Sequence, residues 1–157
     1  MIFKNIKDQF PIFKNKIKGK KLIYLDSANS SQKPQTVIDS ISDFYTNRFS
    51  NVGRGIYTLA VNASEDYEKT RSSIKKFIGS GKDYELIFTK NATESLNLVA
   101  SCFGEKFINK GDEIILTDME HHANYVPWHF LRKKKGAVIK FIPIDKDGNL
   151  QLDKLPS

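Results

Sequence analysis

Apolar and polar positions follow two different patterns along this chain of 157 residues. Short continuous apolar runs bounded by polar turns predict buried strands, and these runs cover residues 22–25, 86–89, 113–117 and 137–142. Between them, apolar residues recur at helical intervals, in the segments 37–45, 67–78, 96–103 and 126–131. An alternation of strands and helices favours parallel βαβ units, so the pattern predicts an α/β fold.

Boundary signals refine these elements. Pro34 suits the first turn of a helix. The tetrapeptide 62–65, Asn-Ala-Ser-Glu, resembles a capping box with Asn62 as the cap. The segment 145–149, which includes Gly148, predicts a turn after the last strand.

The chain divides into an arm and one domain. Residues 1–21 carry apolar side chains among charges and then a lysine-rich stretch, which predicts an amphipathic N-terminal arm and an exposed connection. The arm lacks the continuous apolar core of a signal peptide. No linker interrupts residues 22–157, which we expect to form one α/β domain. The three or four strands predicted there are fewer than such sheets usually carry, so we expect this domain to be truncated.

Composition narrows the class of protein. The net charge is +7, with 25 Lys and Arg residues against 18 Asp and Glu. Only four of the cations are arginines, and the lysines are spread over the chain, which favours a solvated surface over a nucleic-acid site. No apolar run reaches the length of a membrane span. The single cysteine, Cys102, excludes an internal disulfide framework and favours a reducing, cytoplasmic location.

The segment 118–128 is the first candidate site, because it follows a predicted strand at the edge where α/β sheets bind ligands. It holds His121 and His122, two of the three histidines. Metal-binding, acid–base and structural roles are all open for them. Zinc requires three or four ligands, and neither HExxH nor CxxC is present, so we expect no metal site. Trp128 and Phe130 are expected to be core residues, and Cys102 a buried, inert thiol.

The turn 90–94 is the second candidate site. A strand that leads directly into a helix presents free backbone N–H groups, which bind phosphate readily. Thr93 adds a hydroxyl donor, and Asn91 is among the few non-glycine residues that tolerate a left-handed turn. The alternative is that Asn91 or Thr93 simply caps a structural helix.

Taken together, these segments resemble the SufS-type, NifS-like cysteine desulfurases of the class V aminotransferase family. Four segments match the family in its order, and the last of them is highly specific: 24–28 with 32–34; 51–55 with 58–59; 92–94 with 97–99; and 119–124 with 126–128. The resemblance implies the N-terminal part of the large domain of a pyridoxal 5'-phosphate (PLP)-dependent transferase of the aspartate-aminotransferase fold, fold type I. It also implies a homodimeric enzyme that converts L-cysteine to L-alanine and transfers the sulfur, as a persulfide, to an acceptor protein for iron–sulfur cluster assembly.

The same resemblance implies roles for five residues. His121 matches the histidine that stacks on the pyridine ring and assists proton transfer. Ala92 and Thr93 match the phosphate-binding turn, and Ala28 and Asn29 match the small-residue turn beside the substrate. The chain departs from the family at four positions. Gly53 and Tyr57 stand where the family usually has His, Asn29 stands where it usually has alanine, and Asn91 stands where many members have Gly.

The Schiff-base lysine, the Asp that pairs with the pyridine nitrogen and the nucleophilic cysteine would all lie beyond Ser157. Neither Cys102 nor any lysine of this chain stands in the matching motif. We therefore expect the isolated chain to be inactive and to need a C-terminal half. Two alternatives remain open: a truncated or decayed reading frame without catalysis, and a portion of a selenocysteine lyase or another class V aminotransferase.

Overall fold

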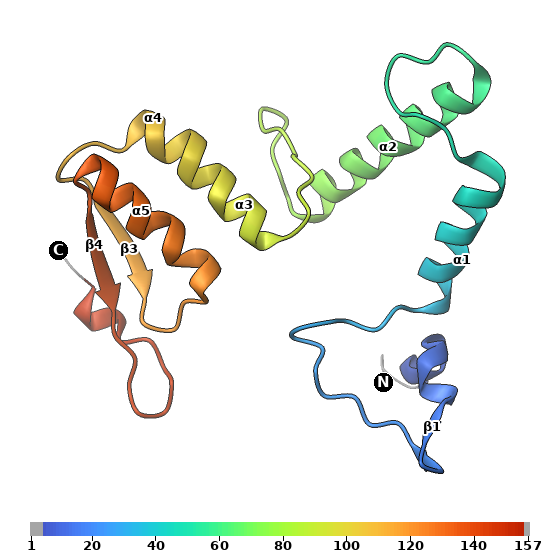
Figure 1. The fold of residues 1–157 in the computed structure, drawn as a ribbon, viewed down its shortest axis with the longest axis horizontal. Coiled ribbons are helices and arrows are strands. Elements are labelled where there is room, and N and C mark those ends of the chain that lie inside the picture. Colours follow the sequence, from blue (N-terminus) through green and yellow to red (C-terminus); the bar gives the residue numbers. More distant parts are fainter. Residues whose placement is uncertain (1–4, 156–157) are drawn as a thin grey trace. The chain divides into compact units, whose positions relative to one another are not determined.

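A computed structural model describes residues 5–155 of the chain. The chain forms two compact units, one ending at Leu86 and the other beginning at Ile87 (Figure 1). The arm and domain predicted from the sequence divide the chain differently, at residue 21, and that boundary stays a prediction. Residues 1–4 of the arm lie outside the described residues.

The first unit is mainly helical. Its elements are η1 (Ile6–Gln9), η2 (Pro11–Lys14), β1 (Lys16–Ile17), β2 (Lys20–Lys21), α1 (Gln35–Asp43), η3 (Phe44–Arg48) and α2 (Thr58–Phe77). The strands β1 and β2 form an antiparallel hairpin within the predicted arm. The helix predicted after Pro34 is confirmed as α1, which continues into the π-helical turn η3.

The helix α2 begins at Thr58, so the capping box predicted at residues 62–65 is wrong. Ala60 and Ala63 are buried, and a Cβ on Gly55 would overlap Ala60. Because α2 spans Thr58–Phe77, Ser64 lies inside the helix. Its Oγ donates to the Ala60 carbonyl at 2.7 Å and accepts the Gly53 N–H at 3.0 Å. The helix thus begins about one turn before the predicted cap, where the preceding loop packs closely against it.

Two predicted strands are not formed. Residues 22–25 and 86–89 have no regular secondary structure, and Leu25 is 92% exposed. A strand is stabilised by the hydrogen bonds of a neighbouring strand, and among the described residues neither run pairs with one. The Leu86 carbonyl accepts a hydrogen bond from the Arg71 guanidinium instead.

The second unit contains the βαβ arrangement that the sequence predicts. Its elements are α3 (Ala92–Val99), η4 (Ala100–Gly104), α4 (Glu105–Phe107), β3 (Glu113–Thr117), η5 (His122–Asn124), α5 (Val126–Lys135), β4 (Val138–Ile142) and η6 (Leu152–Lys154). β3 and β4 pair in parallel, with Glu113 opposite Val138 and Thr117 opposite Ile142. The α/β prediction is therefore confirmed for this unit, with two strands in place of three or four.

The core of the second unit lies between α5, η4 and the sheet. Its buried side chains are Ala100, Leu116, Leu131, Ala137 and Ile142. Gly136 ends α5 in the left-handed conformation at φ 75°, which glycine adopts without strain. Figure 1 shows α5 alongside the two strands and α3 beside α5. This packing fixes the turn that joins β3 to α5.

The predicted turn 145–149 is confirmed. The Asp145 carboxylate accepts the N–H groups of Asp147 at 2.8 Å and Asn149 at 2.9 Å. Within residues 5–155, no helix has both the length and the apolar character needed to cross a membrane.

Candidate functional site

The turn between β3 and α5 is held by a chain of side-chain hydrogen bonds. The Thr117 hydroxyl donates to Glu120 Oε1 at 2.8 Å, and Asn124 Nδ2 donates to Glu120 Oε2 at 2.7 Å. The Trp128 indole N–H then donates to Asn124 Oδ1 at 2.9 Å. The network thus joins the last residue of β3 to the first turn of α5. Its members Glu120 and Asn124 flank His121 in the sequence.

Glu120 is the acceptor at the start of this network. The Asn124 amide above all, and then the Thr117 hydroxyl, hold the pKa of Glu120 below its ordinary value of 4.5. A carboxylate that accepts several hydrogen bonds favours its charged form. Glu120 therefore stays ionised at neutral pH and keeps the turn bonded.

His121 is the N-cap of η5 and is exposed. Its Nδ1 accepts the backbone N–H of Ala123 at 3.1 Å, and the Asn124 N–H donates to its carbonyl at 2.8 Å. Because Nδ1 is an acceptor, the neutral imidazole carries its proton on Nε2. The ring of His122 lies edge-on, 6.2 Å from that of His121.

The N-terminus of α3 forms the second predicted site. Asn91 is the N-cap, and its Oδ1 accepts the Glu94 N–H at 2.9 Å. The Glu94 carboxylate accepts the Lys90 N–H at 2.6 Å. The capping role considered for Asn91 is therefore confirmed. Within the described part of the chain, no hydrogen bond engages the N–H groups of Ala92 and Thr93 or the Thr93 hydroxyl, so three donors remain for a ligand.

The second unit brings three of the predicted residues onto neighbouring elements. η5 contacts α3, so the turn of His121 lies against the helix that Ala92 and Thr93 begin. Ala28 and Asn29 belong to the other unit. They lie in an exposed turn in which the Asn29 N–H donates to the Asp26 carbonyl at 3.2 Å.

Other expectations from the sequence have mixed outcomes. Trp128 is half-buried and hydrogen-bonded, but Phe130 is 64% exposed and is not a core residue. Cys102 is exposed, so the prediction of a buried thiol is wrong. Both differences have one cause: a helical stripe of apolar residues does not show which of its members face a neighbouring element. No group of three or more potential metal ligands occurs among residues 5–155.

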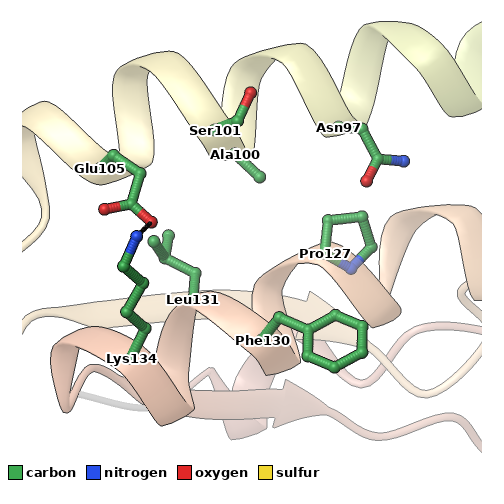
Figure 2. Close-up of a pocket in the computed structure, with 8 residues that line it drawn as sticks. All are labelled: Asn97, Ala100, Ser101, Glu105, Pro127, Phe130, Leu131 and Lys134. Carbon is green, nitrogen blue, oxygen red and sulfur yellow. Dashed lines mark ion pairs between the residues drawn. The ribbon is translucent and has the colours of Figure 1, made fainter.

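A pocket of about 180 Å³ separates η4 from α5. Its floor is formed by Ala100 and Leu131, and the ion pair between Glu105 and Lys134, at 2.7 Å, lies at one end (Figure 2). Pro127, at the end of the first predicted site, lines this pocket, but neither His121 nor Thr93 does.

The aminotransferase class-V family model matches residues 23–157. The chain belongs to this family. Among curated members, it is 48% identical over 150 residues to the probable cysteine desulfurase of Staphylococcus epidermidis strain RP62A, covering 96% of this chain and 36% of that protein. It is 45% identical over 151 residues to the cysteine desulfurase of Serratia proteamaculans, covering 96% and 37%. The chain thus spans little more than a third of these relatives.

Solved structures of the family agree with this assignment. The apo cysteine desulfurase of Thermococcus onnurineus superposes with a TM-score of 0.84 at 36% identity, over 95% of this chain and 35% of that one. The Escherichia coli cysteine desulfurase CsdA gives a TM-score of 0.68 at 32% identity, over 88% and 34%. The predicted membership of the class V aminotransferase family is confirmed, and the chain is similar to the N-terminal portion of cysteine desulfurases, with part of a fold type I domain.

The residues present fit a phosphorylated cofactor of this family in two respects. The unbonded N–H groups of Ala92 and Thr93, with the Thr93 hydroxyl, form a donor set suited to a phosphate at a helix N-terminus. The exposed imidazole of His121 provides a flat surface for an aromatic ring. Glu120 was not singled out from the sequence, although Glu120, Asn124 and Trp128 recur at intervals of four residues, a spacing that could have suggested contacts among them.

Proposed function

We propose that this chain is the cofactor-binding portion of a PLP-dependent cysteine desulfurase, which converts L-cysteine to L-alanine and passes the sulfur to an acceptor protein for iron–sulfur cluster assembly. One observation carries the proposal: within one unit, the turn of His121 lies against α3, and the first residues of α3 have unbonded hydrogen-bond donors that could bind a phosphate. The names of its relatives support the same reaction. The proposal includes a cytoplasmic homodimer.

In this proposal, Ala92 and Thr93 hold the cofactor phosphate. A phosphate carries more than one negative charge, and the N-terminus of α3 is the positive end of the helix dipole. The Asn91 cap keeps the Glu94 N–H occupied, so the ligand meets the donors of the first two helical residues. The Glu94 carboxylate is held on the Lys90 N–H.

His121 orients the cofactor ring and manages a proton. PLP supplies an electron sink for the bond changes at the substrate. With Nδ1 occupied by the Ala123 N–H, His121 presents Nε2–H as its free polar atom. That atom can donate a hydrogen bond, or exchange its proton, at a site above the ring. Ala28 and Asn29 are proposed to border the substrate.

Cofactor binding is tested with two ligands that differ only by the phosphate. Isothermal titration of the chain with pyridoxamine 5'-phosphate, which has no aldehyde, is compared with pyridoxamine. We expect only the phosphorylated ligand to bind, and Thr93→Val to weaken it. Thr70→Val is the matched control, because the Thr70 hydroxyl bonds to a carbonyl of α2 in the other unit. Equal binding of both ligands would exclude the phosphate site.

The reaction is tested on the longest natural form that carries this chain. Alanine and sulfide release from L-cysteine should depend on His121, whereas release from selenocysteine alone would indicate a selenocysteine lyase. No lysine of this chain lies in the family's Ser-Gly-His-Lys context. We therefore expect PLP mixed with the 157-residue chain to leave no absorbance that survives dialysis.

A further inference from the structure

Asn124 makes more hydrogen bonds across the turn from β3 to α5 than any simple capping role requires. Its backbone N–H donates to the His121 carbonyl at 2.8 Å, and its Nδ2 donates to Glu120 Oε2 at 2.7 Å. Its Oδ1 accepts the indole N–H of Trp128 at 2.9 Å. We propose that Asn124 is the positioning residue that holds His121 with Nδ1 on the Ala123 N–H and the imidazole proton on Nε2.

The polarity of the asparagine amide suits its two partners. The Trp128 indole can only donate, and the ionised Glu120 carboxylate can only accept. One end of the Asn124 side chain must therefore be an acceptor and the other a donor. Aspartate has the same size but lacks the donor, and it would place a second carboxylate against Glu120. Alanine would remove both of these hydrogen bonds, and Glu120 would keep only its bonds to Thr117.

Both anchors of Asn124 are fixed independently. Glu120 is bonded to the Thr117 hydroxyl at 2.8 Å, at the end of β3. Trp128 is half-buried in the first turns of α5. The amide thus joins a strand end to a helix start, and the short helical turn η5 lies between them.

This arrangement determines what His121 can do. The Ala123 N–H, 3.1 Å from Nδ1, can be accepted only when Nδ1 carries no proton. While the turn stays closed, a neutral ring has its proton on Nε2 and offers a hydrogen-bond donor outward. The atom that meets His121 from a bound ligand must then be an acceptor. The identity of that ligand rests on the proposed function, whereas the hydrogen bonds are independent of it.

The test is a nuclear magnetic resonance measurement on the full 157-residue chain, labelled with ¹⁵N and without cofactor. Long-range ¹H–¹⁵N spectra report which ring nitrogen is protonated, and a scalar coupling across the hydrogen bond joins the Ala123 nitrogen to Nδ1. We expect the coupling and a single Nε2–H tautomer in the wild type. Asn124→Ala should lose the coupling and show a mixture of tautomers.

Asn97→Ala is the matched control, because it also removes one side-chain amide hydrogen bond, from Asn97 Nδ2 to the Thr93 carbonyl at 2.9 Å. It should keep the coupling. Asn124→Asp and Trp128→Phe each break one hydrogen bond of the network, and each should lose the coupling. These two variants test the positioning role if Asn124→Ala does not fold. A wild type without the coupling, or a folded Asn124→Ala that retains it, overturns the proposal.

The two proposals fail separately. Coupling without binding of pyridoxamine 5'-phosphate would refute the cofactor role and leave the positioning role intact. Binding of that ligand by a wild-type chain that lacks the coupling would refute the positioning role and leave the cofactor role intact.

Discussion

Asn91 offers a substitution series in which stability and ligand binding should move in opposite directions. Its Oδ1 accepts the Glu94 N–H at 2.9 Å, and its backbone is extended, with φ −169° and ψ 174°. Any residue can adopt that backbone, so a change at this position alters the cap and little else. Replacing an asparagine cap by alanine costs about 1 kcal/mol, and replacing it by glycine costs only a few tenths. We expect Asn91→Ala and Asn91→Gly to follow this order.

Asn91→Asp separates the two roles. The aspartate keeps the acceptor and adds a negative charge at a helix N-terminus, which stabilises by about 0.3–1 kcal/mol. The same charge opposes a phosphate held by the neighbouring N–H groups of Ala92 and Thr93. A like charge about 4 Å away costs about 1 kcal/mol even in water, or about five-fold in affinity. The variant should therefore be at least as stable as the wild type and bind pyridoxamine 5'-phosphate more weakly.

Stability is measured by urea denaturation followed through the fluorescence of Trp128, the only tryptophan, which lies in the second unit. Affinity is measured by calorimetry. Asn97→Ala is the control for loss of a side-chain bond on the same helix. Two results would refute the reasoning: an Asn91→Ala variant as stable as the wild type, and an Asn91→Asp variant with unchanged affinity for the phosphorylated ligand.

Three further predictions concern the second unit. Leu131→Ala, at a residue only 4% exposed, should cost about 2–5 kcal/mol in denaturation, whereas the adjacent Phe130→Ala, 64% exposed, should cost about 0.5 kcal/mol; similar losses would contradict the assigned core. The lowered pKa of Glu120 means that its stabilisation is present at neutral pH and lost as pH falls below 4.5. Glu120→Gln should thus be less stable than the wild type at pH 7, and the difference in unfolding free energy should shrink in acid. A difference that grows as pH falls would contradict the lowered pKa. His129 Nδ1 is buried without a hydrogen-bond partner in the described structure, so His129→Leu should raise the unfolding free energy by about 1 kcal/mol, and a loss of stability would indicate a partner for that atom.

The periodicity of the sequence was sufficient where an element is stabilised by its own neighbours. The strands β3 and β4 and the helix α5 between them form one βαβ unit, in which each element lies beside the next in sequence. The helices after Pro34 and Asn91 also begin where local signals place them. In these cases the hydrogen bonds and the apolar face needed for the element are supplied nearby.

The same reasoning failed where stabilisation comes from distant residues. The run at 86–89 is as apolar as a buried strand, but no strand pairs with it among the described residues. At the start of α2, the loop at Gly55 packs closely against Ala60, a contact that no capping pattern encodes. Likewise, a helical stripe does not reveal which of its members face a partner, as Phe130 and Leu131 show.

For the candidate site, the resemblance of the sequence to the family pointed to His121, Ala92 and Thr93, and their role at a phosphorylated ring stays a prediction. The order of residue types along the chain carries such a resemblance, because chemistry depends on which functional groups are present. Only the tertiary structure decided that η5 lies against α3, that three donors there stay unbonded, and that His121 Nδ1 is occupied by the Ala123 N–H. These features depend on the directions of hydrogen bonds, and those are determined only when the strand, the turn and the helix pack together.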